Sequence, residues 1–164
     1  PFLTSIEKPL ARFLNDHNEV SFKILANRPG VSRLIPADRM IFTPWSREVE
    51  VEELYDMTIG IMPLFDSVWA RGKCSLKMLQ YMAIGLPVVA SPVGMNSEVL
   101  SQGDIGFAAD SDDKWYEAFE TLYKDESLRD TMGMSGRKII EEHYSSDKVA
   151  RDIARILRKA AGCQ

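Results

Sequence analysis

The chain has 164 residues, 45% of them hydrophobic and 27% charged, which is ordinary for one soluble α/β domain with a sizeable core. The net charge of −4 argues against nucleic acid as a main partner, no apolar run is long enough to span a membrane, and we expect no signal peptide. The two cysteines, Cys74 and Cys163, are too few for a disulfide framework and predict free thiols in a reducing compartment.

The first part of the chain predicts a helix followed by three strands. Apolar residues at helical spacing predict a helix over residues 3–15, and His17 at its end is expected to be solvated. Ser46 is expected to cap a short helix over residues 51–55. Apolar, β-branched and aromatic residues predict strands over residues 21–27, 39–45 and 58–64.

Residues 69–96 are the segment on which the functional interpretation depends. We expect a loop over residues 65–72, then a helix that starts near Lys73 to Ser75, runs to Ile84 and is ended by Gly85. A loop with Gly94 should follow the next strand. The elements expected after Gly85 are a strand over residues 86–91, a short helix over 97–100 and a strand over 105–108.

The remainder of the sequence is predicted to be helical. Ser111 is expected to cap one helix, and Ser127 with Asp130 resembles a capping box for a second. A last helix opens at Ser146 with one apolar and one basic face. The basic face is read as a solvated surface, with a contact to a missing domain or to lipid headgroups as the alternative; it contains Arg151, Arg155, Arg158 and Lys159.

This alternation of strands and helices predicts a parallel sheet with helices on both faces, a Rossmann-like doubly wound α/β fold with additional C-terminal helices. Ligands of such sheets bind at the carboxyl ends of the strands. Trp45 and the loops over residues 65–73 and 91–96 all follow strand ends, so we expect them to converge on one edge. The chain is interpreted as a single domain, residues 1–164.

The helix near residues 73–84 carries a polar face at its start. Lys73, Lys77 and Gln80 have the spacing of one helical face, and basic residues at a helix amino terminus suit a diphosphate. Gln80, one turn further along, suits a hydroxyl such as that of a ribose. The alternative is a solvated polar face. The core-facing residues are expected to be Leu76, Leu79, Met82 and Ala83.

These residues carry a resemblance to a known family. The run from Gln80 to Ala90, QYMAIGLPVVA, resembles the E-x-M-A-x-G-x-P-V-V-A signature of family 4 (group 1) glycosyltransferases, which are GT-B enzymes that use nucleotide sugars. Ser75 and Lys77 match a common variant, S-x-K-x-x-E-Y-M-A. The resemblance implies the C-terminal, donor-binding half of a GT-B fold, and it covers most of the chain.

The resemblance also implies roles for individual residues. Gln80 stands at the second glutamate of the E-x7-E element, which binds ribose, and Gly72 stands where the family often has a sugar-contacting glutamate. Gly94 matches the small residue of the donor loop. The residues implied for the donor diphosphate are Arg71, Lys73, Ser75 and Lys77. Trp45 and Ser46 fall at the base-contacting loop, with Trp45 as a simple core residue left open.

The implied function is a metal-independent, retaining glycosyltransferase that moves a sugar from a UDP- or GDP-sugar to a hydroxyl acceptor, without a cofactor. Its setting would be polysaccharide biosynthesis in the cytoplasm, with peripheral contact of the full-length protein at the inner membrane face. Two alternatives remain: a non-catalytic nucleotide-sugar-binding module, and another GT-B-like enzyme such as a nucleotide-sugar epimerase. His17 and His143 are expected outside the cleft, which disfavours an epimerase.

The chain begins at Pro1, so we expect a processed or truncated piece. The resemblance implies an N-terminal acceptor-binding domain for which this chain has no room, so the piece alone is expected to be inactive. No strand-like run precedes Leu3, whereas the resemblance implies a central strand before the first helix. The sequence therefore predicts a sheet whose central slot is filled by a neighbouring chain, by another segment or by nothing.

Overall fold

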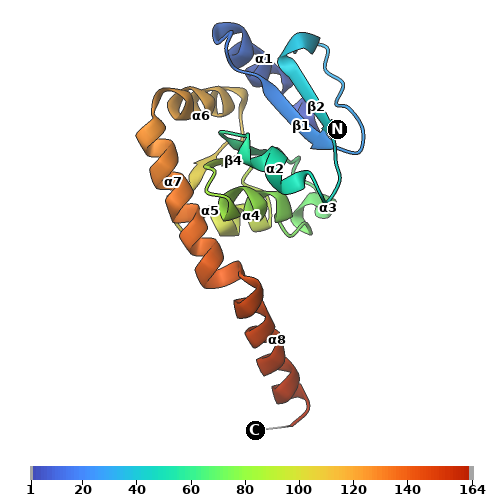
Figure 1. Ribbon diagram of the computed structural model, residues 1–164, viewed down its shortest axis with the longest axis vertical. Coiled ribbons are helices and arrows are strands. Elements are labelled where there is room, and N and C mark those ends of the chain that lie inside the picture. Colours follow the sequence, from blue (N-terminus) through green and yellow to red (C-terminus); the bar gives the residue numbers. More distant parts are fainter. Residues whose placement is uncertain (1, 163–164) are drawn as a thin grey trace.

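The computed structural model describes residues 2–162 and has parallel β-structure packed between helices (Figure 1). The strands form two separate parallel sheets, β1-β2 and β3-β4-β5. This confirms the predicted α/β class, and each strand lies within its predicted range. The strands are β1 (Phe22–Ala26), β2 (Met40–Pro44), β3 (Gly60–Met62), β4 (Val88–Ala90) and β5 (Gly106–Ala108).

Helices flank the strands and make up the carboxyl-terminal part of the chain (Figure 1). The α-helices are α1 (Glu7–Asp16), α2 (Glu50–Tyr55), α3 (Val68–Arg71), α4 (Leu76–Ala83), α5 (Met95–Leu100), α6 (Asp112–Lys124), α7 (Glu126–Ile139) and α8 (Ser146–Ala160). Short helical turns are η1 (Phe2–Ser5), η2 (Ala37–Arg39) and η3 (Ile140–Tyr144). None of the helices within residues 2–162 combines the length and the apolar character that crossing a bilayer requires.

Residues 65–72 were predicted to form a loop without regular structure, and this is wrong because they contain a helical turn, α3. The Ser67 hydroxyl accepts a hydrogen bond from the Ala70 backbone N–H at 3.1 Å and caps this turn. Ser46 does not cap α2, because the residue before α2 is Val49, which makes no side-chain cap. The expected capping box of Ser127 and Asp130 is also wrong, since Asp125 caps α7 and accepts the N–H of Leu128 at 2.8 Å.

The buried face of α4 differs from the predicted one. Met82 is fully buried as predicted, but Met78, which was not predicted, is fully buried as well, and Leu76 is 58% exposed. The helix is turned because α7 packs against it through two buried glycines, Gly133 and Gly136. Helical periodicity locates an apolar face only to within neighbouring residues, and here the close approach of α7 decides which of them are buried.

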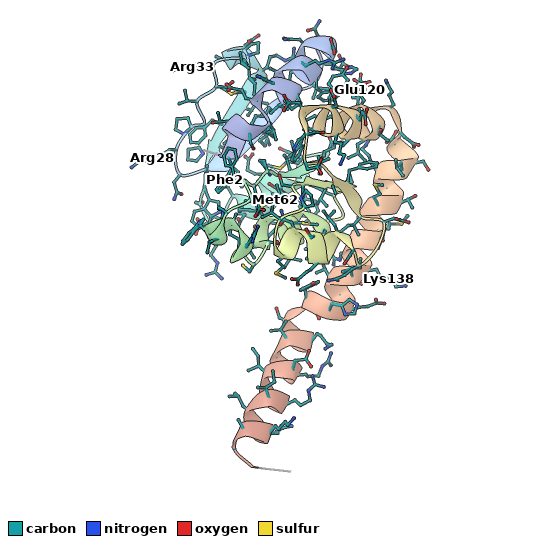
Figure 2. All side chains as sticks on the ribbon, turned by 180° about the vertical axis from the view of Figure 1, so that it is seen from behind. Phe2, Arg28, Arg33, Met62, Glu120 and Lys138 are labelled. Atoms are coloured by element: carbon teal, nitrogen blue, oxygen red, sulfur yellow. The ribbon has the colours of Figure 1, made fainter. Side chains whose placement is uncertain are left out.

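His17 was predicted to be solvated, but its ring packs against two aromatic rings. Its ring lies 4.8 Å from the Phe13 ring and 4.1 Å from the Tyr123 ring, between centroids. Its Nε2 is hydrogen-bonded to Glu120 on α6, the helix that packs against α1. Figure 2 shows Glu120 on α6 close to α1. The histidine therefore joins two helices that are about 100 residues apart in sequence, a contact that local pattern does not reveal.

The Glu120 contact predicts a pH-dependent stability. Hydrogen bonds from Lys124 and then from His17 lower the pKa of Glu120 to about 2. A carboxylate with a lowered pKa contributes stability that is present above its unfolded-state pKa and is lost as the pH falls towards the folded-state value. We expect Glu120→Gln to lower the free energy of unfolding by about 1–3 kcal/mol at pH 6 and by progressively less from pH 4.5 to pH 2.5.

Urea unfolding across this pH range measures the difference. The control is Glu117→Gln, an exposed glutamate on the same helix, which should change stability little at any of these pH values. A constant effect of Glu120→Gln from pH 6 to pH 2.5 would show that the contact does not depend on the carboxylate charge.

The last helix, α8, extends away from the rest of the fold (Figure 1). None of its residues is buried, and its apolar side is exposed at Val149, Ile153, Ile156 and Leu157. On the polar side, Lys148 and Arg155 pair with Asp152. The predicted amphipathic helix is confirmed, while the two interpretations of its basic face remain predictions.

Candidate functional site

The predicted convergence of three loops at one edge of the fold is confirmed. Trp45 directly follows β2, Lys77 lies in the first turn of α4, and both donate hydrogen bonds to Glu50, the first residue of α2. The loops after β3 and β4 also meet, because the Leu64 N–H donates to the Ser91 hydroxyl at 3.0 Å. The carboxyl ends of the parallel strands thus surround the start of α4.

Glu50 is the centre of the polar cluster and was not predicted from the sequence. Its Oε1 accepts from Lys77 Nζ at 2.7 Å and from Trp45 Nε1 at 3.0 Å. The bond from Lys77 is the main cause that lowers the pKa of Glu50, followed by the bond from Trp45. Glu50 is therefore ionised at neutral pH. The only sequence feature that could have indicated Glu50 as a site residue is its position shortly after the strand that ends in Pro44-Trp45.

Gln80 presents an unused hydrogen-bond acceptor beside this cluster. Its side-chain Oε1 is buried and has no hydrogen-bond partner among residues 2–162. A hydrogen bond from its amide also contributes to lowering the pKa of Glu50, so the two side chains are neighbours. Buried acceptors without partners are uncommon because losing water without replacement is unfavourable. A ligand hydroxyl placed here would satisfy the Gln80 oxygen.

The start of α4 is held by buried polar contacts. Ser75 has a φ of +53°, is 2% exposed, and donates from Oγ to Asn96 Oδ1 at 2.6 Å. Asn96 in turn donates to the Ser91 carbonyl at 3.0 Å. The Ser75 hydroxyl is thus directed into the fold and not towards solvent. The first N–H groups of α4 have no partner within the helix, and they remain available at its start.

Arg71 and Lys73 lie just before α4. The Arg71 guanidinium donates two hydrogen bonds to Asp66, at 2.6 and 2.8 Å, and is 65% exposed. The Lys73 ammonium lies 4.1 Å from the centroid of the Phe2 ring, and Lys73 has no carboxylate partner within the described part of the chain. Two of the three predicted cations are therefore partly neutralised by acidic residues, Lys77 by Glu50 and Arg71 by Asp66.

Gly94 brings the loop after β4 against this segment. It has a φ of +55°, and a Cβ there would lie 2.8 Å from both the Cα and the carbonyl oxygen of Arg71. Only glycine allows the two backbones to approach so closely. Gly72, by contrast, has an ordinary φ of −83° and ends α3. The sequence interpretation singled out Gly72 because it stands where the family often has a glutamate. Its backbone conformation does not require glycine.

The structure thus brings together most of the predicted site residues. Trp45, Lys77 and Gln80 meet around Glu50, and Arg71 meets Gly94. Trp45 is 44% exposed, so the alternative that it is a core residue is wrong. The Ser46 side chain is hydrogen-bonded to Glu48, where it helps to lower the pKa of that carboxyl group. The roles of these residues towards a ligand remain predictions.

Both histidines lie away from the start of α4. His17 is held between α1 and α6, and His143 lies in η3, beyond α7. Cys74 is exposed and free, while Cys163 lies outside the described residues. Within residues 2–162 there is no group of three or more histidine, cysteine, aspartate or glutamate side chains placed to hold a metal ion.

A family model described as "Glycosyl transferases group 1" matches residues 2–125. The chain is 31% identical over 121 residues to N-acetyl-alpha-D-glucosaminyl L-malate synthase of Bacillus anthracis, covering 73% of this chain and 30% of that protein. It is also 31% identical over 77 residues to the capsular polysaccharide biosynthesis glycosyltransferase CapM of Staphylococcus aureus, and this match covers 46% of this chain and 20% of that protein. The chain therefore spans less than a third of the length of these curated relatives.

Solved structures show the same fold at low sequence identity. A mutant of TarM of S. aureus, in complex with fondaparinux, alpha-GlcNAc-glycerol and UDP, superposes with a TM-score of 0.71 at 15% identity, covering 94% of this chain and 33% of that one. Sucrose-phosphate synthase of Thermosynechococcus elongatus superposes with a TM-score of 0.70 at 14% identity, and the match covers 96% of this chain and 43% of that one. The C-terminal domain of the glycosyl transferase group 1 family protein LpcC of Francisella tularensis superposes with a TM-score of 0.67 at 14% identity. This match covers 88% of this chain and 80% of that one.

Proposed function

The chain belongs to the group 1 glycosyltransferases, and from this premise we propose that it is the donor-binding domain of a retaining hexosyltransferase. In the proposed reaction a sugar passes from a nucleotide diphosphate sugar, such as a UDP- or GDP-sugar, to a hydroxyl acceptor. The observation that carries the proposal is the buried, unpartnered Gln80 oxygen beside Glu50 and Lys77 at the start of α4. The complex of TarM with UDP supports a nucleotide ligand for this fold.

The proposed diphosphate position is the amino terminus of α4. Its free N–H groups and the helix dipole favour an anion, and Arg71 and Lys73 before the helix and Lys77 in its first turn add positive charge. Lys77 has three donor hydrogens and Glu50 takes one of them, so the ammonium can bridge the carboxylate and a phosphate oxygen. The Ser75 side chain is engaged inside the fold, so we assign its phosphate contact to the backbone alone.

The proposed ribose position lies between Gln80 and Glu50. Gln80 lacks the negative charge that the family pattern has there, and Glu50, to which it is hydrogen-bonded, supplies a carboxylate beside it. Ribose hydroxyls would donate to the Gln80 oxygen and to Glu50. Trp45, with its ring partly exposed and its N–H fixed by Glu50, offers a flat surface for the base.

We propose that departure of the nucleoside diphosphate needs no metal, because the cations and the helix terminus can stabilise its developing charge. The domain alone is expected to be inactive, since the acceptor would bind to a further domain of the full-length protein. The proposed setting is polysaccharide biosynthesis at the cytoplasmic side, with the full-length protein contacting the inner membrane face peripherally. The name of the relative CapM and the amphipathic α8 support this setting.

Calorimetric titration of the full-length protein with UDP, GDP and ADP tests the proposal. One of these nucleotides is expected to bind, with the same affinity in 5 mM EDTA as in Mg²⁺, within about threefold. Binding that requires Mg²⁺ would refute metal independence. Binding of none of them would favour a non-catalytic module with a different ligand. Conversion of a nucleotide sugar to its epimer without any acceptor would favour the epimerase alternative.

A further inference from the structure

Ser75 stands at the amino-terminal cap of α4, but its side chain does not cap the helix. Serine is favoured at this position because its hydroxyl accepts a hydrogen bond from an N–H two or three residues further on. Ser75 instead has a left-handed backbone, with a φ of +53° and a ψ of +27°. Three other serines at helix starts do cap, with N–H contacts of 3.1 to 3.4 Å: Ser67, Ser111 and Ser145. The missing cap at α4 therefore has a local cause.

The cause is a hydrogen bond to Asn96, the second residue of α5. Asn96 is fully buried; its Oδ1 accepts from Ser75 Oγ at 2.6 Å, and its Nδ2 donates to the Ser91 carbonyl at 3.0 Å. A carbonyl group can only accept, so the NH₂ of Asn96 faces Ser91 and its oxygen faces Ser75. The single hydroxyl hydrogen of Ser75 is thus directed to Asn96 and away from the axis of α4.

This contact stabilises a backbone conformation that serine otherwise avoids. A residue with a Cβ is strained in the left-handed region, and it persists there only where surrounding contacts hold it. Among residues 2–162, Ser75 is the one residue other than glycine with a positive φ. Because Ser75 is buried, water cannot take the place of Asn96. Without Asn96, the ordinary partner for the hydroxyl of a cap serine is the N–H three residues further on, that of Met78.

The N–H groups at the start of α4 are open as a result. The Leu79 N–H makes the first backbone bond of the helix, to the Ser75 carbonyl at 3.1 Å. The three N–H groups before it, those of Leu76, Lys77 and Met78, have no partner among residues 2–162. They are the groups that the proposed function assigns to the diphosphate.

We propose that Asn96 is a positioning residue of the donor site. It holds Ser75 in the left-handed conformation without a cap, so that the first N–H groups of α4 stay free for the diphosphate of the nucleotide sugar. Asn96 acts through Ser75 and does not touch the ligand, because it is fully buried. This role rests on the proposed function, since it needs a diphosphate at the start of α4.

An open helix start favours anion binding by preorganisation. Free N–H groups are unfavourable while nothing binds them, because a cap would stabilise the helix. The protein without nucleotide therefore keeps an unfavourable helix start, which a bound phosphate relieves. The phosphate does not first have to displace a serine hydroxyl, and this raises its affinity without adding a contact.

Calorimetric titration of the full-length protein with UDP, GDP and ADP tests the role. Asn96→Ala should weaken the nucleotide that binds the unmodified protein by about tenfold, which corresponds to the loss of one N–H donor to a phosphate. In Ser75→Gly the residue has no hydroxyl and adopts the left-handed conformation freely. Adding Asn96→Ala to Ser75→Gly should therefore change the affinity by less than about threefold relative to Ser75→Gly alone. An equal loss in both backgrounds would overturn the proposal.

The matched control is Ser91→Ala. The buried Ser91 hydroxyl accepts from the Leu64 N–H at 3.0 Å, so this variant also removes a buried polar contact from the same loops. It leaves the Ser91 carbonyl that orients Asn96 in place. The affinity should fall by less than about threefold. A loss as large as that of Asn96→Ala would show a general loosening of these loops and would contradict the role.

Hydrogen exchange of the nucleotide-free protein gives a readout that needs no ligand. The Met78 amide should exchange at least about fivefold more slowly in Asn96→Ala than in the unmodified protein, since the Ser75 hydroxyl is then released to cap it. It should exchange fast again when Ser75→Gly is added. Unchanged exchange of Met78 in Asn96→Ala would overturn the proposal. Asn96→Ser replaces the alanine variant if that variant does not fold, because its shorter side chain cannot reach both Ser75 and the Ser91 carbonyl.

The titrations separate this role from the proposed function. If the unmodified protein binds none of the three nucleotides, both the proposed function and the role of Asn96 are refuted. If it binds one of them and Asn96→Ala binds that nucleotide equally tightly, the role of Asn96 alone is refuted.

Discussion

Replacing Gly133 with alanine is expected to lower the free energy of unfolding by about 3 kcal/mol or more. A Cβ at this position would lie 1.9 Å from the carbonyl oxygen of Gly85 and 2.8 Å from its carbonyl carbon. Gly85 follows α4 with a φ of +81°, so its backbone cannot shift without disturbing the end of the helix that carries the candidate site. Both clashing groups are backbone, which leaves no flexible side chain to move aside.

The matched control is Gly136→Ala on the same helix, α7. Its Cβ would meet Met82 Cγ at 3.3 Å, and a methionine side chain can adjust. Alanine also favours a helix over glycine by up to about 1 kcal/mol, so we expect the stability to change by less than about 1 kcal/mol. Urea unfolding of both variants gives the comparison. Similar small effects in the two variants would show that α7 does not pack on Gly85 as described.

Replacing Lys77 with alanine in the full-length protein is expected to weaken nucleotide binding by about 10- to 100-fold, equivalent to about 1.5–3 kcal/mol for a charge-assisted hydrogen bond. The loss should lie towards the upper end, because the variant also leaves the ionised Glu50 without its cation, next to the proposed diphosphate. Calorimetric titration with the nucleotide that binds the unmodified protein measures the effect.

Two further variants make this result specific. Lys138→Ala removes a 73% exposed lysine on α7 and should leave the affinity unchanged. Adding Glu50→Gln to Lys77→Ala should restore part of the lost affinity, since it removes the uncompensated negative charge while the amide oxygen can still accept a ribose hydroxyl. Full affinity in Lys77→Ala would refute the phosphate role, whereas a loss that Glu50→Gln deepens would show that the proposed ribose contact needs the charge of the Glu50 carboxylate.

The sequence was sufficient for the order and type of most elements. Residues 21–27, 39–45 and 58–64 have the apolar, β-branched composition of strands, and each contains one. Ser111 caps α6 as predicted, and Gly85 follows α4 with a positive φ. These features depend on interactions within a few residues, namely side-chain periodicity, hydrogen bonds to free N–H groups and the backbone freedom of glycine.

Part of the candidate site could be predicted because it also depends on residues that are close in sequence. Lys77 and Gln80 lie on one helix, so their spacing alone puts them on neighbouring turns. That spacing does not reveal Glu50, which reaches Lys77 from a different helix 27 residues earlier in the chain. Nor does it show that Ser75 turns its hydroxyl inward to Asn96, a contact between segments 21 residues apart.

The sequence by itself determined a parallel α/β fold of the group 1 type, with a polar helix start at the carboxyl edge of its strands. Only the tertiary structure decided which side of α4 is buried, that His17 joins α1 to α6, and that Glu50 meets Lys77. The physical reason is that side-chain periodicity and caps act locally. Burial, ion pairing and sheet closure depend on which distant segments meet.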